Sequence, residues 1–268
     1  MTRTKTIGLC LAAVLAVAAI AVSSAAAFAP EFGRCLKQAT KSLSNFDNGK
    51  CVKLASEDGG TESEKLKKGN YQWFSGVVNN KFTTAIKPST IVTLQTLLGA
   101  KLTCTGETST GEYTGPTEVG HVVITFTGCE LKVMCESAGA GGGRIITTPL
   151  AGTLGFETIT EDTPAKDRLA LELHAEGGGN VMEFHCSGVP YAVRGSVLHK
   201  ITANAMKLTA TESFSAYRGK QKPDHFAGGS AGEHILEFSL NGNPFEQAGL
   251  NFIAILTNEE KVEASTIN

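Results

Sequence analysis

HVVITFTGCELKVMC, from His121 to Cys135, contains the clearest strand pattern in the chain. Alternate residues up to Thr127 fall on two faces, as a half-buried strand requires. One face carries Val122, Ile124 and Phe126, and the other carries Val123, Thr125 and Thr127. Gly128 interrupts the alternation, and Cys129 and Cys135 follow close together. The stretch therefore predicts a core strand that runs into a cross-linked turn.

The same kind of alternation extends on both sides of this stretch, from Ser89 to the end of the chain. Thr, Val, Ile and Leu alternate in short segments, and glycine-bearing turns separate these segments. No segment after residue 89 sustains a helical period. We therefore predict that residues 89–268 form an all-β domain, either an antiparallel β-sandwich or a barrel-like fold. Within it, GETSTGEYTGPTEVG (106–120) contains four glycines and predicts a loop.

Residues 30–88 differ from the rest because they show little periodicity. We predict a small, irregular N-terminal layer with a short helix in this region, held by a disulfide bond. Tyr71, Trp73 and Phe74 form its densest aromatic cluster. Such a cluster is either a ligand-stacking platform for carbohydrate or the anchor that fixes the layer to the main core.

The first 29 residues have the features of a secretory signal peptide. A short positive end precedes the apolar run 9–22, and small residues follow in the A-x-A arrangement that signal peptidase recognises. The apolar run is shorter than the roughly 20 residues that span a bilayer. The sequence predicts a cleaved signal and an exported protein, and the alternative is a retained membrane anchor.

Cysteine usage agrees with export. Six cysteines follow the signal, and an even number in an exported chain predicts disulfide bonds. Six cysteines allow 15 pairings. The pairing that we predict joins nearest neighbours first: Cys35–Cys51, Cys129–Cys135 and, as a long-range link, Cys104–Cys186. A metal cluster is the alternative, but the chain has no C-x-x-C pair.

Charge and motifs exclude several classes of function. The chain has 24 Lys and Arg against 26 Asp and Glu, with no basic stripe for nucleic acid. No later segment is long enough to span a membrane, and no zinc-helix, calcium-loop or dinucleotide motif occurs. The glycine-rich run 137–144 lacks the lysine and the helix of a phosphate loop, so it predicts a flexible turn. We predict no cofactor, no nucleic-acid partner and no membrane span in the mature chain.

Convergent polar side chains are predicted in one place only, the hairpin 168–186. Its two strands have apolar inward positions, and a turn at 177–180 joins them. The outward positions carry Glu172, His174, Glu183 and His185. In the simplest register His174 faces Glu183, and Glu172 faces His185. These side chains suit a divalent metal or an acid–base pair, and the alternative is two cross-strand pairs on a solvated sheet face.

Several strings along the chain carry a resemblance. They include PEFGRC (30–35), KLTCTGETSTGEYTGP (101–116), TTPLAGTLG (147–155), GKQKPDHF (219–226) and TNEE (257–260). Together, and in this order, they resemble a set of uncharacterised secreted bacterial proteins. The resemblance covers nearly all of the chain after residue 29. It implies an exported protein that acts outside the cytoplasm, and it implies no activity, cofactor or catalytic residue.

These observations favour a secreted, non-catalytic protein with a binding or structural role at the bacterial cell surface or outside it. Its partner would be cell-wall polysaccharide or another surface protein. The alternative is an extracellular hydrolase or metal-dependent enzyme that uses the face with Glu172, His174, Glu183 and His185.

Overall fold

The computed structural model describes residues 30–39, 44–53, 55, 69–157, 168–202, 205–222, 226–227 and 235–265. Within these ranges the chain forms strands and turns but no helix, and every strand pair is antiparallel. No helix long and apolar enough to cross a membrane occurs in them. The prediction of an all-β fold is confirmed. The short helix expected within 30–88 is absent from the described part of that region, whereas residues 40–43, 54 and 56–68 lie outside it.

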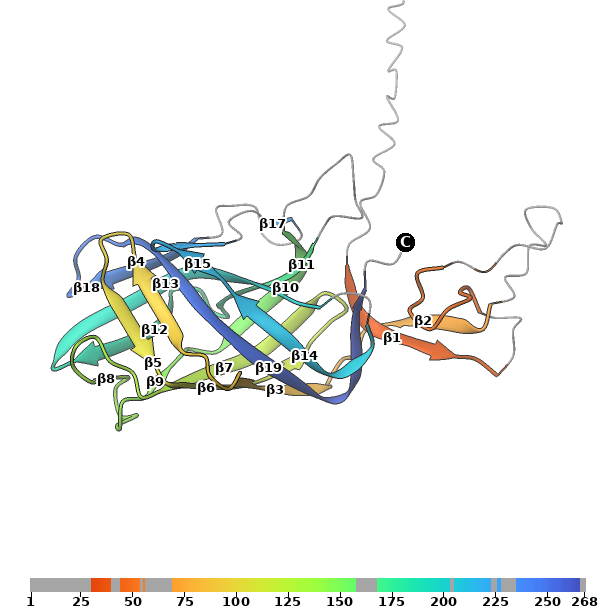
Figure 1. Ribbon diagram of the computed structural model, residues 1–268, viewed down its shortest axis with the longest axis horizontal. Coiled ribbons are helices and arrows are strands. Elements are labelled where there is room, and N and C mark those ends of the chain that lie inside the picture. Colours follow the sequence, from red (N-terminus) through yellow and green to blue (C-terminus); the bar gives the residue numbers. More distant parts are fainter. Residues whose placement is uncertain are drawn as a thin grey trace, which may run out of the picture.

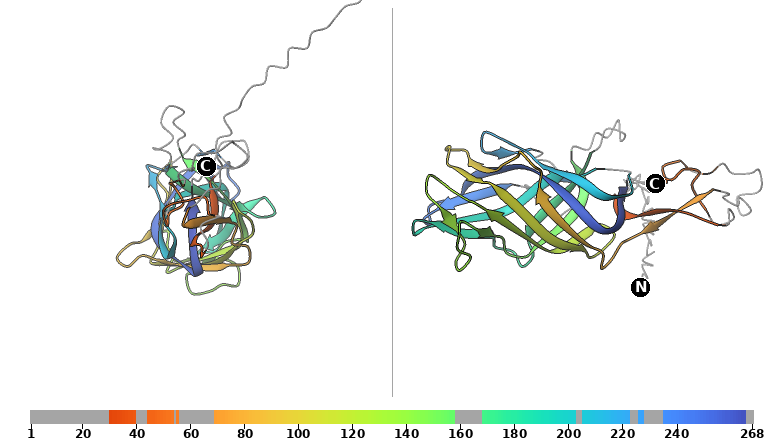
Figure 2. Two further views of the ribbon diagram at one scale, coloured as in Figure 1. Left: turned by 90° about the vertical axis from the view of Figure 1, so that its right-hand side faces the viewer. Right: turned by 60° about the horizontal axis from the view of Figure 1, so that its bottom comes forward.

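In the described part of the chain, eight strands pair in a closed ring, which we call the proximal ring. Its order is β3–β6–β7–β10–β11–β13–β14–β19, and β19 pairs with β3 again. The strands are β3 (Lys81–Ile86), β6 (Gly106–Tyr113), β7 (Glu118–Thr127), β10 (Leu150–Glu157), β11 (Arg168–Ala175), β13 (Val189–Lys200), β14 (Lys207–Phe214) and β19 (Glu246–Ser265). The left view of Figure 2 looks along the long axis and shows the strands arranged around it. Of the two predicted architectures, the structure has the barrel-like one.

A second closed arrangement, the distal ring, continues the first one along the long axis (Figure 1). It contains β4–β19–β18–β13–β12–β8 and, on the other side, β4–β5. The strands new to this ring are β4 (Val92–Thr96), β5 (Lys101–Cys104), β8 (Cys135–Glu136), β12 (Asn180–Cys186) and β18 (Leu236–Leu240). Glu130 closes it by bridging to Thr103 of β5 and to Met134 beside β8.

Three short strand pairs lie outside this scheme. β9 (Ile145–Ile146) pairs with β7, β17 (Phe226–Ala227) pairs with β10, and β15 (Ala216–Tyr217) forms a hairpin with β16 (Lys220–Gln221). One apolar core runs through both rings, and the stacked rings of Phe214 and Phe252, 4.2 Å apart, lie within it. The two rings therefore fold around a shared interior.

Two long strands connect the rings, and one of them depends on a glycine. β13 pairs with β18 up to Gly195 and with β11 from Ser196. Gly195 has a φ of 93°, which side chains rarely adopt. A Cβ atom at this position would overlap the carbonyl oxygen of Ile235. The passage of β13 from one ring to the other thus requires a residue without a side chain.

We expect Gly195→Ala to lower the free energy of unfolding by about 1–3 kcal/mol, because it combines backbone strain with a steric clash. Urea denaturation followed by near-UV circular dichroism measures this loss. Gly188→Ala is the matched control, since Gly188 also has a positive φ, 83°, but a Cβ there meets no atom within 4 Å. Equal losses in the two variants would show that the contact with Ile235 is unimportant.

β1 (Glu31–Lys37) and β2 (Tyr71–Ser75) form an extension at the proximal end, visible on the right of Figure 1. The start of β1 pairs with the end of β19, and Phe32 packs into the main core. The rest of β1 pairs with β2. β3 lies within residues 30–88 but belongs to the proximal ring, so the part that stands apart is smaller than the layer that the sequence predicts.

All six cysteines after residue 29 form disulfide bonds, as predicted, but the pairing is only partly as predicted. Cys35–Cys51 is confirmed. The other two predicted bonds were wrong, because the structure contains Cys104–Cys129 and Cys135–Cys186. The segment from Cys129 to Cys135 fills the gap between β5 and β12 in the distal ring, and each end is cross-linked to the strand beside it. The bonds therefore close a ring, whereas the prediction placed one of them within a local turn.

Candidate binding groove

The surface of the distal ring contains an open groove of about 890 Å³. It lies over β12, β13 and β18, between the turn after β8 and the turn after β18. The polar and aromatic side chains that line it include Asn180, Glu183, His185, Arg194, Asn243 and Phe245. Sugar-sized and peptide-sized ligands both fit a hollow of this volume.

The alternation of β12 places Glu183 and His185 at this groove. Met182, Phe184 and Cys186 are buried, so Glu183 and His185 lie on the other face. β13 lies beside β12, and its Arg194 is opposite Asn180. Polar side chains from two adjacent strands therefore share one surface.

Arg194 and Phe245 contact each other in the groove. The Arg194 guanidinium lies 3.8 Å from the centre of the Phe245 ring, a cation–π contact. The same side chain donates a hydrogen bond from Nε to Oε2 of Glu237 over 2.7 Å. The Arg194 guanidinium therefore packs on the Phe245 ring at the groove surface.

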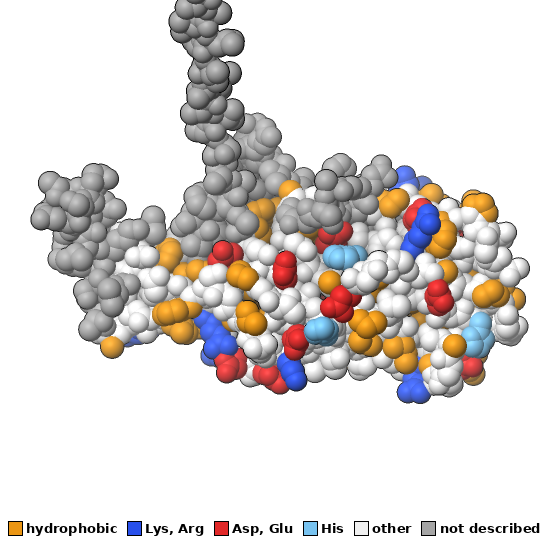
Figure 3. Space-filling model, turned by 180° about the vertical axis from the view of Figure 1, so that it is seen from behind, with side chains coloured by type: hydrophobic (Ala, Val, Ile, Leu, Met, Phe, Trp, Pro, Cys, Tyr) orange, Lys and Arg blue, Asp and Glu red, His pale blue; other side chains and the backbone are white. Residues whose placement is uncertain are grey.

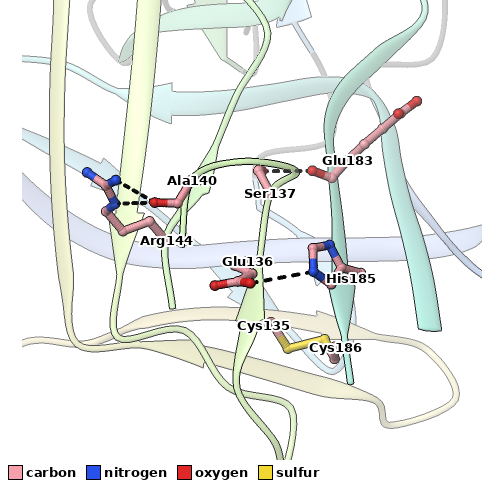
Figure 4. A network of polar contacts seen from close by, with 8 residues as sticks. All are labelled: Cys135, Glu136, Ser137, Ala140, Arg144, Glu183, His185 and Cys186. Atoms are coloured by element: carbon pink, nitrogen blue, oxygen red, sulfur yellow. Dashed lines mark hydrogen bonds and ion pairs between the residues drawn. A yellow bond between two sulfur atoms is a disulfide. The ribbon is translucent and has the colours of Figure 1, made fainter. Parts of the chain in front are cut away.

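The opposite side of the groove is formed by the turn that follows Cys135 (Figure 4). His185 Nε2 lies 3.6 Å from Oε1 of Glu136, and the Ser137 hydroxyl donates a 2.8 Å hydrogen bond to the carbonyl oxygen of Glu183. Arg144 donates hydrogen bonds to the carbonyl oxygen of Ala140 within the same turn. The Cys135–Cys186 bond adds a covalent link to β12, so this side is rigidly attached to the sheet.

The hairpin predicted for residues 168–186 was wrong in its pairing. β11 pairs with β10 and β13, whereas β12 pairs with β13 and β8. As a result, Glu172 and His174 lie in the proximal ring, and Glu183 and His185 lie in the distal ring. Among the described residues, no group of three or more His, Cys, Asp or Glu side chains is arranged to hold a metal ion. Two of the four predicted residues, Glu183 and His185, do line the groove.

The aromatic cluster of the N-terminal region is divided by the strand that carries it. Tyr71 and Trp73 pack against a small core of their own, which contains Cys35, Phe46 and Cys51. Trp73 Nε1 also donates a hydrogen bond to Glu31 over 3.3 Å. Phe74 points to the other side and is 46% exposed. Tyr71 and Trp73 therefore stabilise the extension internally. The alternative that the cluster anchors this region to the main core was wrong.

Sequence reasoning missed a cluster of polar side chains inside the proximal ring. Glu107 and Ser109 of β6, Glu212 of β14 and His199 of β13 are all buried. The predicted loop 106–120 was wrong, since β6 occupies Gly106–Tyr113 and β7 begins at Glu118. The sequence pattern that could have indicated this strand is the regular alternation of Glu107, Ser109 and Gly111, whose buried positions are not apolar side chains.

Comparisons with protein-family models, with curated proteins and with solved structures found no match to this chain. The class that the fold and the site define is an all-β, disulfide-bonded protein with an open groove on one ring.

Proposed function

We propose that the protein is a secreted, non-catalytic binding protein that acts at the bacterial cell surface or outside it. The signal-peptide pattern of residues 1–29, which lie outside the described residues, supports export, as does the resemblance to secreted bacterial proteins. Three disulfide bonds are consistent with an oxidising compartment. A rigid, cross-linked fold suits a protein that works without chaperones or reductants.

The groove favours a polysaccharide as the ligand. It combines an oriented aromatic ring, Phe245, with amide and charged groups such as Asn180 and Arg194. Sugars present both apolar C–H faces and hydroxyl groups, so they pair with this mixture of aromatic and polar side chains. Acidic and basic side chains are interspersed on the face shown in Figure 3, and the formal net charge of the chain is only −2, which argues against a highly charged polymer. The open groove with its oriented aromatic ring is the observation that carries the proposal.

We expect the Phe245→Ala variant of the mature protein to bind its polysaccharide about tenfold more weakly than the wild type, because the stacking surface is lost. The measurement is co-sedimentation with insoluble cell-wall polysaccharide at a series of protein concentrations. Phe74→Ala is the matched control, since Phe74 is an exposed aromatic residue far from the groove. Its binding should equal that of the wild type.

Three results would contradict this proposal. Loss of binding in Phe74→Ala alone would move the site to the N-terminal extension. Binding to whole cells that disappears after protease treatment of the cells would identify a surface protein as the partner. Release of soluble sugar during the incubation, abolished by His185→Ala, would favour a hydrolase, for which the His185–Glu136 pair at the groove is the acid–base candidate.

A further inference from the structure

The interior of the proximal ring contains ionisable groups in a position where a core is normally apolar. Glu107, Glu212 and His199 are 3%, 6% and 1% exposed. They come from three strands, β6, β14 and β13, and all three side chains line one small cavity of about 20 Å³. The fold therefore brings together two carboxyl groups and an imidazole inside a closed ring.

The contacts within this cluster leave polar atoms unused. Thr84 donates a hydrogen bond to Oε1 of Glu107 over 2.6 Å, and His199 Nε2 lies 3.6 Å from Oε1 of Glu212. Oε2 of Glu107 and both ring nitrogens of His199 have no hydrogen-bond partner among the described residues. A buried polar atom without a partner costs about 1–3 kcal/mol. Nε2 of His199 faces Glu212, so Oε2 of Glu107 and Nδ1 of His199 are the two atoms that a ligand at this cavity can satisfy.

A second cavity lies between this cluster and the exposed surface. This cavity, of about 50 Å³, also borders Glu212 and shares Phe82 and Leu171 with the first. It extends to Thr202 and Lys207, which are exposed. Both cavities exceed the 10–15 Å³ that one water molecule needs. Glu212 therefore borders both cavities, and the outer one extends from Glu212 to exposed residues.

The lining defines the chemistry of the ligand. The outer cavity is mostly apolar, and the rings of Phe32 and Phe82 pack edge-on against Tyr113 within it. The inner cavity ends at the carboxyl groups of Glu107 and Glu212 and a ring nitrogen of His199, and a carboxyl group keeps an acceptor oxygen whether or not it is protonated. A neutral imidazole has one acceptor nitrogen, and an ammonium group has three N–H donors. The complement of this lining is an apolar body with an ammonium group at one end.

We propose that the interior of the proximal ring is a binding site for a small apolar amine, whose ammonium group lies among Glu107, Glu212 and His199. The site is separate from the groove at the distal ring, which is lined by other residues. A divalent metal is a poorer match, since no described group of His, Cys, Asp and Glu is arranged to hold one. Binding of the amine requires no change in the disulfide bonds or in the pairing of the strands.

The test uses n-alkylamines of two to six carbons, added to the mature, disulfide-bonded protein. Alkanols and alkanoic acids of the same lengths are the matched probes. Chemical shifts of the Phe82, Leu171 and Phe214 side chains report binding inside the ring. We expect amines to bind at least about tenfold more tightly than alkanols, because a hydrogen bond to a charged group is stronger than one between neutral groups. Alkanoic acids should not bind.

Two variants separate the site from a merely apolar cavity. Glu212→Gln should weaken amine binding about tenfold and leave alkanol binding unchanged. Ala210→Leu fills the outer cavity and should abolish amine binding while the acceptors stay intact, so it tests the site even if Glu212→Gln fails to fold. Ala138→Leu, in the groove, is the control and should bind amine as the wild type does.

Two results would overturn the proposal. The first is equal binding of amines and alkanols in the wild type, which would show that the carboxyl groups play no part. The second is the absence of any shift at high amine concentration, which would show that buried water alone satisfies the cluster.

Discussion

Replacing Cys135 and Cys186 together with alanine is expected to lower the free energy of unfolding by about 4 kcal/mol, the largest effect that we predict. The two cysteines are 51 positions apart in the sequence. In the chain-entropy model, a cross-link that closes a loop of this length restricts the unfolded chain by about that amount. Equilibrium urea denaturation of the oxidised protein measures the loss.

The location of the bond adds a structural reason. β8 has only two residues and pairs with β12 through His185 and Cys186. Without the bond, so short a strand has little to hold it in the distal ring. We therefore also expect faster amide hydrogen exchange in β8 and β12 of the variant.

The double variant of Cys35 and Cys51 to alanine is the matched control. These cysteines are 16 positions apart, and they pack in the small core of the extension and not in the rings. Their removal should lower the stability less and leave hydrogen exchange in β8 and β12 unchanged. An equal loss in both double variants would contradict the role that we assign to Cys135–Cys186.

Tryptic digestion without reductant separates the observed pairing from the one that the sequence suggests. Cys104 and Cys129 lie in one tryptic peptide, 102–132, whereas Cys135 and Cys186 lie in 133–144 and 169–194. The structure therefore requires one internally bonded peptide and one linked pair of peptides. Bonds Cys129–Cys135 and Cys104–Cys186 would instead join all three peptides.

The sequence predicts many strands correctly but not their neighbours. The segment 168–175 has the alternation of a strand, and β11 occupies Arg168–Ala175. Its pairing with β12 was inferred because the two are adjacent in the chain. Ala170, Leu171 and Glu172 are all buried, so both faces of β11 are covered and no solvated face exists to fix the register. Pairing was therefore set by ring closure, a long-range property that local alternation does not contain.

A strand whose buried side chains are polar is also difficult to predict from sequence. Glu107 and Ser109 face the core of the proximal ring, and the alternate residues Thr108 and Thr110 are exposed. Such a segment has no apolar face, so the hydrophobic pattern that identifies strands is absent. The groove was partly predicted because Glu183 and His185 alternate with buried apolar residues. Arg194 and Phe245 were missed because their contact joins β13 to a distant turn.

Stability should fall as pH rises, because of the carboxyl group of Glu107. Burial raises the pKa of Glu107 from 4.5 to about 7, and the negative charge of Glu212 adds to this increase. The hydrogen bond from Thr84 opposes it. In the folded state the group therefore keeps its proton at pH values where the unfolded chain has released it.

The direction of the pH effect follows from proton uptake. Between pH 4.5 and 7 the folded state binds more protons than the unfolded state, so the free energy of unfolding decreases as pH increases. The contribution of Glu107 is fully present below about pH 4.5 and is lost as pH rises through 7. A shift of this size corresponds to about 3 kcal/mol. Glu263, which is fully buried, acts in the same direction, since burial raises its pKa to about 7 against the opposing charge of Lys50.

Glu107→Gln removes the ionisable group and keeps an oxygen atom that can accept the hydrogen bond from Thr84. We expect this variant to be more stable than the wild type at pH 8 by about 3 kcal/mol and to have nearly the same stability at pH 4.5. Urea denaturation at a series of pH values measures the difference. Glu118→Gln, at an exposed position of β7, is the control and should follow the wild-type curve. If Glu107→Gln also follows that curve, Glu107 is ionised in the folded protein at neutral pH, and the buried cluster carries a negative charge that its described neighbours must compensate.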